Sequence, residues 1–120
     1  MSVKLNTRKV GDVTVIDAAG RITLGEGAST FRDAIRDLAA KGDKKLLVNL
    51  SDVSYIDSSG LGELVSAYTT VRNKQGDVKL LNLTAKAKDL LQMTKLLTVF
   101  DVYDDEAKAV AALKASKTSA

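Results

Sequence analysis

The chain contains no cysteine, histidine, proline or tryptophan. Without cysteine it can form neither a disulfide framework nor a thiolate metal site. Without histidine it lacks the commonest general base and the commonest metal ligand, so Ser-His-Asp and Cys-His catalytic arrangements are excluded. Carboxylate chemistry is the main catalytic option that remains open.

Aromatic residues make up only 4% of the 120 residues, whereas hydrophobic residues make up 45% and charged residues 28%. This composition is typical of a folded, soluble protein with an aliphatic core. No apolar run approaches the length of a membrane span, and Met1 to Gly11 lacks the apolar stretch of a signal peptide. We therefore predict a cytoplasmic protein that has no membrane partner.

The net charge of +3 comes from lysines and arginines scattered along the chain, and no basic run is longer than two residues, as in Lys44-Lys45. Nucleic-acid-binding proteins more often concentrate their cations in a stripe with stacking aromatics. The charge therefore indicates solubility, and we expect no nucleic-acid partner.

Apolar periodicity divides the chain into alternating strands and helices. Val3–Val10 and Asp12–Ala18 are predicted to form a hairpin through Gly11-Asp12, and Gly20 is predicted to break the second strand. A connection is predicted from Ser51 to Asp57, after a nearly continuous apolar strand. Further strands are predicted over Lys45–Leu50, Val78–Leu83 and Leu97–Tyr103, and helices over Gly25–Lys41, Ser59–Lys74, Lys86–Leu91 and Asp105–Ala115.

The alternation of strand and helix calls for parallel strands joined by helical crossovers, and the opening hairpin adds a mixed edge. We predict an α/β sandwich with a mixed sheet of four to five strands and about four helices packed on it. Residues 1–115 are predicted to be a single domain, and residues 116–120 a frayed tail. The side chains expected to be largely buried are Leu47, Val48, Leu64, Val65, Tyr68 and Leu80.

The most informative stretch lies where the apolar strand gives way to the second long helix. It reads Tyr55-Ile56-Asp57-Ser58-Ser59-Gly60-Leu61-Gly62-Glu63-Leu64. Helix N-termini present unpaired N–H groups and favour anions, so a phosphate suits this place. Small polar residues here also have a purely structural explanation as N-caps. Gly60 and Gly62 each cost up to about 1 kcal/mol in a helix, which indicates close approach by a partner, a phosphate or a neighbouring loop.

Asp57-Ser58-Ser59-Gly60-Leu61-Gly62 resembles the phosphorylation motif of bacterial anti-sigma factor antagonists in the STAS superfamily. The resemblance extends to most of the chain. It includes Leu47-Val48-Asn49-Leu50 with Val53 and Ile56, Gly20-Arg21-Ile22-Thr23, and Met93-Thr94-Lys95-Leu96 followed by Val99-Phe100.

The resemblance implies a STAS fold and a regulatory binding protein that is not an enzyme and needs no cofactor or metal. In that family the first serine of the motif, here Ser58, accepts phosphate from an anti-sigma factor that is also a serine kinase. The unmodified antagonist binds this kinase, the phosphorylated form does not, and a serine phosphatase restores binding. By position, the motif and partner-binding residues are Asp57, Ser58, Ser59, Gly60, Leu61, Gly62 and Glu63.

Three positions depart from the family pattern. Thr23 stands where the family often has an acid, Lys95 where a glycine is usual, and Glu63 where apolar residues are common. None of these removes the acceptor serine, although Glu63 bears on which kinase docks.

Two other functions stay open at this point. One is a non-switching STAS scaffold or adaptor in a signalling or transporter-associated assembly, in which Ser58 is a mere cap. An apolar oligomer surface in the structure would favour it. The other is an enzyme that uses Asp52 and Asp57 as a carboxylate pair, although no nucleophile–base pair accompanies them.

Overall fold

A mixed five-stranded sheet organises the part of the chain that the computed structural model describes, residues 3–23, 25–95 and 100–115. The strand order is β1-β2-β3-β4-β5; β1 is antiparallel to β2, and the other neighbours are parallel. In chain order the elements are β1 (Val3–Val10), β2 (Val13–Ile22), α1 (Glu26–Ala40), β3 (Lys45–Ile56), α2 (Ser58–Asn73), β4 (Asp77–Leu81), α3 (Ala85–Met93), β5 (Val102–Tyr103) and α4 (Glu106–Ala115). The predicted α/β sandwich, with a mixed sheet of four to five strands and about four helices packed on it, is confirmed.

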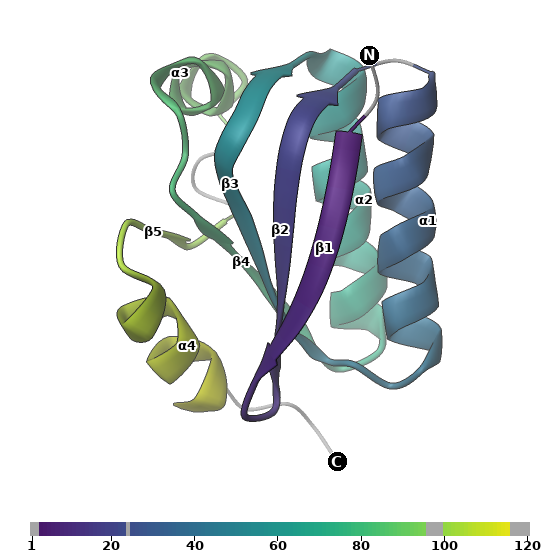
Figure 1. The fold of residues 1–120 in the computed structure, drawn as a ribbon, viewed down its shortest axis with the longest axis vertical. Helices are drawn as coiled ribbons and strands as arrows, with labels where there is room; N and C mark the ends of the chain where they lie inside the picture. Colours follow the sequence, from purple (N-terminus) through teal and green to yellow (C-terminus); the bar gives the residue numbers. More distant parts are fainter. Residues whose placement is uncertain (1–2, 24, 96–99, 116–120) are drawn as a thin grey trace.

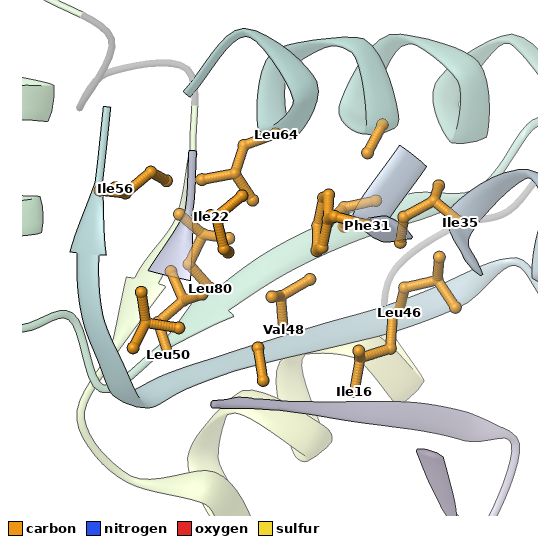
Figure 2. Close-up of a cluster of buried hydrophobic side chains, with 14 of the residues drawn as sticks. Ile16, Ile22, Phe31, Ile35, Leu46, Val48, Leu50, Ile56, Leu64 and Leu80 are labelled. Atoms are coloured by element: carbon orange, nitrogen blue, oxygen red, sulfur yellow. The ribbon is translucent and has the colours of Figure 1, made fainter. Parts of the chain in front are cut away.

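Helices α1 and α2 lie side by side on one face of the sheet, and α4 lies on the other face (Figure 1). The main core is the aliphatic layer between the sheet and the α1–α2 pair, as the composition predicts (Figure 2). Ile22 at the end of β2, Ile56 at the end of β3 and Leu64 on α2 all belong to this layer. The layer therefore fixes the start of α2 against the ends of β2 and β3.

Helix α4 covers a smaller cluster on the opposite face, where Leu113 packs with Val13, Val15 and Leu47. Arg8 on β1 ties this helix to the sheet. Its Nε donates to Asp17 Oδ2 over 2.7 Å, and its guanidinium also pairs with Glu106 in the first turn of α4. The hydrogen bonds from Arg8 lower the pKa of both carboxyl groups below their ordinary values.

Two strands are longer than the sequence indicates. Gly20 does not end β2, and the predicted connection Ser51–Asp57 is strand as far as Ile56. The two strands stay paired to Ile22↔Ile56 through register shifts, and Gly20 has a φ of 104° that suits such an irregularity. This part of β3 resembles a loop in sequence because its exposed positions carry polar residues, namely Ser51, Asp52 and Ser54.

The last strand is shorter than predicted. Of the predicted Leu97–Tyr103, residues 97–99 lie outside the described residues, and of the remainder only Val102 and Tyr103 pair with β4. Phe100 and Asp101 are not strand, although the parallel register would set them opposite Val78 and Lys79 of β4. Phe100 is instead buried in the main core. β4 itself ends at Leu81, before Asn82 with its φ of 58°. The predicted tail, residues 116–120, also lies outside the described residues.

The predicted burial is correct for four of the six core positions. Leu47, Val48, Leu64 and Leu80 are at most 2% exposed. Val65 and Tyr68 are only half-buried and pack against the edge of the core. The ring of Tyr68 meets that of Phe100 edge-on, with 5.5 Å between centroids, and the Arg72 guanidinium lies 5.8 Å from the centroid of the Tyr68 ring.

Candidate functional site

The predicted motif lies where β3 passes directly into α2, with Asp57 as the one residue between them. Asp57 has an extended backbone, and its Oδ1 accepts a hydrogen bond from the Gly60 N–H over 2.8 Å. Asp57 is therefore the N-cap, the role for which the sequence offered three small polar candidates. The helix begins at Ser58, one residue from the predicted start.

Ser58 is exposed at the first position of α2, whereas Ser59 is half-buried. Within the described residues the Ser58 hydroxyl makes no hydrogen bond, since Asp57 takes the capping role. The hydroxyl thus stands at the positive end of the helix dipole, beside the first-turn N–H groups that favour an anion. This exposed placement is the one predicted for a phosphate acceptor.

The two glycines of the motif have different environments. A Cβ on Gly60 would lie 2.9 Å from the carbonyl carbon of Ile22 and closer still to its carbonyl oxygen. The same carbonyl oxygen accepts from the Asp57 N–H over 3.3 Å. Gly60 therefore lets α2 approach the end of β2. Close approach by another segment of the same chain thus explains why a glycine stands at this position. Gly62 has nothing within 4 Å of a Cβ and is exposed, so packing does not explain it.

Leu61 and Glu63 complete the motif. Leu61 is 3% exposed and anchors the first turn of α2 in the core. Glu63 faces α1, where its Oε2 lies 3.7 Å from a guanidinium nitrogen of Arg32. The carboxylate that departs from the family pattern thus has a cation beside it, which weakens its repulsion of a negative charge at Ser58.

The end of β2 adds a feature that the sequence analysis did not identify as part of the site. Arg21 and Tyr55 are register partners on β2 and β3, and the Arg21 guanidinium lies 5.4 Å from the centroid of the Tyr55 ring. Both residues are exposed. The sequence did not indicate this pair, because both predicted strands end before Arg21 and Tyr55.

The carboxylate pair considered for catalysis is not assembled. Asp52 lies in β3 and Asp57 follows that strand, so an extended chain of five residues separates them by about 15 Å. Asp57 is also engaged as the cap of α2. In the part of the chain that the structure describes, no group of three or more acidic side chains is placed to hold a metal ion.

A hollow of about 960 Å³ lies elsewhere, between the start of α3 and the β4–β5 edge. Asn82, Thr84, Lys88 and Tyr103 line it, and no residue from Asp57 to Glu63 does. Glu63 lines a second hollow against α1, but its volume is only about 10 Å³. Neither of these two hollows gives the motif room for a small substrate, whereas its exposed residues suit docking of a macromolecule. None of the described helices is long and apolar enough to cross a membrane.

Comparison with known proteins agrees with this fold. The model of the STAS domain family matches residues 4–109. The anti-sigma-B factor antagonist of Bacillus subtilis (strain 168) is 30% identical over 102 residues, which make up 85% of this chain and 92% of that protein.

Solved structures of two further proteins show the same fold at lower identity. An anti-sigma factor antagonist from Mycobacterium paratuberculosis superposes with a TM-score of 0.84 at 22% identity, covering 94% of this chain and 95% of that one. The antagonist SpoIIAA, 20% identical, superposes with a TM-score of 0.70 in its unphosphorylated form, covering 94% of this chain and all of that one. The phosphorylated form, from Bacillus, gives 0.72, with coverages of 91% and 98%.

Proposed function

The chain belongs to the STAS domain family, and from this premise we propose that it is an anti-sigma factor antagonist switched by phosphorylation at Ser58. In its unmodified form it binds an anti-sigma factor that is also a serine kinase. The kinase transfers the γ-phosphoryl group of ATP to Ser58 Oγ, which releases ADP and the hydroxyl proton. A serine phosphatase removes the phosphate. The observation that carries this proposal is the exposed Ser58 hydroxyl at the start of α2, freed from capping by Asp57.

The electrostatics of the site suit such a switch. A phosphate adds about −1.5 to −2 charge units at neutral pH. The N-terminus of α2 favours that charge, and Asp57 keeps its hydrogen bond to Gly60, so the helix start is retained. A docked partner would have to desolvate the phosphate or neutralise it, whereas a neutral serine imposes neither cost. Binding can therefore change without refolding, in keeping with a fold that matches SpoIIAA in both of its forms.

The scaffold alternative calls for a continuous apolar surface. Among the described residues, the large apolar side chains that are exposed are Tyr55, Met93 and Val102, on three different elements. Such scattered residues are normal on a monomer surface. The phosphorylation switch is therefore the better supported of the two functions.

The test uses the anti-sigma kinases encoded in the same genome, with labelled ATP and a pull-down. Wild type should be labelled, and Ser58→Ala should lose the label yet still bind, because it leaves the surface uncharged. Ser58→Asp should bind more weakly, and Ser59→Ala should keep most of the label. Strong labelling of Ser58→Ala would disprove the acceptor assignment. If no kinase bound or labelled any form, the scaffold function would take precedence.

A further inference from the structure

Arg21 and Tyr55 form an exposed pair at the ends of β2 and β3. Unlike their neighbours along the strands, they do not pack in the main core. Ile22 and Ile56, the next residues on the two strands, are buried in the main core. Because side chains alternate along a strand, Arg21 and Tyr55 are turned away from that core. Tyr55 is 43% exposed, and the Arg21 guanidinium is held over its ring by a cation–π contact.

Arg21 also differs from most other arginines in its electrostatic partners. Arg8, Arg32 and Arg72 each pair with a carboxylate. Arg21 forms no ion pair with any described residue, and Thr23 nearby is neutral. Its planar fork of N–H donors is thus held in place by the ring yet is not engaged with an acid, which is the arrangement that best receives a carboxylate.

This pair lies at the same end of the sheet as Ser58. The carbonyl of Ile22, next to Arg21, receives the Asp57 N–H, and Tyr55 precedes Ser58 by three residues. A protein surface that covers Ser58 and continues over the ends of β2 and β3 onto the face away from α2 would also cover Arg21 and Tyr55. Tyr and Arg are, with Trp, the residue types most enriched among the side chains that dominate the energy of such interfaces.

We propose that Arg21, presented on the ring of Tyr55, recognises an Asp or Glu side chain on the anti-sigma kinase and so determines which kinase docks. This inference rests on the proposed function. It adds a second effect to the switch, since a phosphate on Ser58 would repel the partner's carboxylate from the same surface. The recognition is electrostatic, so raising the salt concentration should weaken it.

The experiment measures the dissociation constant of the unphosphorylated protein for the kinase that binds wild type, at low and at high salt. Arg21→Glu should weaken binding at least tenfold, and Tyr55→Leu about threefold, because Leu retains bulk but removes the support for the guanidinium. Lys74→Glu is the matched control, since it makes the same change of charge at the opposite end of α2 and should stay within twofold of wild type. Replacing the partner's carboxylate with Arg should restore binding to Arg21→Glu.

The variants also distinguish failure of this inference from failure of the proposed function. If wild type binds and Ser58→Asp weakens binding, but folded Arg21→Glu binds within twofold of wild type, only this inference is overturned. If Arg21→Glu does not give the wild-type melting curve, the neutral Arg21→Gln takes its place, and it should weaken binding about fivefold. If wild type neither binds nor is labelled, the proposed function fails and this inference fails with it.

Discussion

Substituting alanine for each glycine of the motif in turn should change stability in opposite directions. Glycine in a helix costs up to about 1 kcal/mol relative to alanine, so either change gains that amount if space allows. Gly62 is exposed and has no atom within 4 Å of a new Cβ. We therefore expect Gly62→Ala to raise the free energy of unfolding by about 0.5–1 kcal/mol.

Gly60→Ala should instead lower the free energy of unfolding. Its Cβ would lie 2.9 Å from the Ile22 carbonyl carbon and nearer to the oxygen, and both are backbone atoms that cannot turn aside. Relieving the clash moves α2 away from β2 and strains the hydrogen bond from the Asp57 N–H. Overpacking costs about 1–3 kcal/mol and the lost hydrogen bond about 1 kcal/mol, against about 1 kcal/mol gained in propensity. The net loss should be about 1–3 kcal/mol.

Urea unfolding followed by circular dichroism measures both variants against wild type under one set of conditions. Similar slopes with shifted midpoints would show that only stability has changed. A Gly60→Ala variant as stable as wild type would refute the tight approach of α2 to β2. A Gly62→Ala variant that lost stability would refute the open space assigned to that position.

Three further predictions test the cap, the core and the ion pairs. Asp57→Ala should lower the free energy of unfolding by about 1 kcal/mol, whereas Ser58→Ala should change it by less than about 0.5 kcal/mol; a larger loss at Ser58 would show that the serine is the cap. Leu64→Ala should cost about 2–5 kcal/mol in the same urea assay, and a loss below about 0.5 kcal/mol would mean that its face of α2 is misplaced. The two carboxyl groups beside Arg8 have lowered pKa values in the folded state, so their contribution is present above the ordinary carboxyl pKa and is lost as the pH falls through the folded values. A pH series of urea unfolding should therefore show an acid-side loss that is smaller in Arg8→Gln, and equal losses would contradict the assignment.

The sequence was most informative where local chemistry and periodicity agree. The hairpin at Gly11, the extent of α1 and the start of α2 after Asp57 all follow from local signals, and the structure has each within a residue or two. The end of β2 was missed because Gly20 interrupts its apolar pattern, and the end of β3 because Ser51, Asp52 and Ser54 are polar and exposed. Pairing across the sheet, which the sequence does not display, keeps them in strand conformation.

The same extension of β3 explains why the site residues were predicted more completely than the surface around them. Asp57, Ser58 and Gly60 act through the local geometry of a helix start, which residue types predict directly. Arg21 and Tyr55 come together only through the register between two strands that are distant in sequence. A long-range pairing of this kind has no local sequence pattern, so only the three-dimensional structure shows that Arg21 and Tyr55 are in contact.

In the motif, Asp57 caps α2, whereas Ser58 is the proposed phosphate acceptor. If Ser58 were the cap of α2, a phosphate on its oxygen would disturb the bond that begins the helix, and modification would cost stability. Because Asp57 makes that bond and Gly60 holds the helix against β2, Ser58 can change its charge while the fold stays in place. In the proposed switch, the two forms would then differ in the charge they present to a partner rather than in conformation. All of the switching free energy must consequently come from the partner's unequal affinity for the two forms, so it is the docking surface, and not the fold, that sets how complete the switch is.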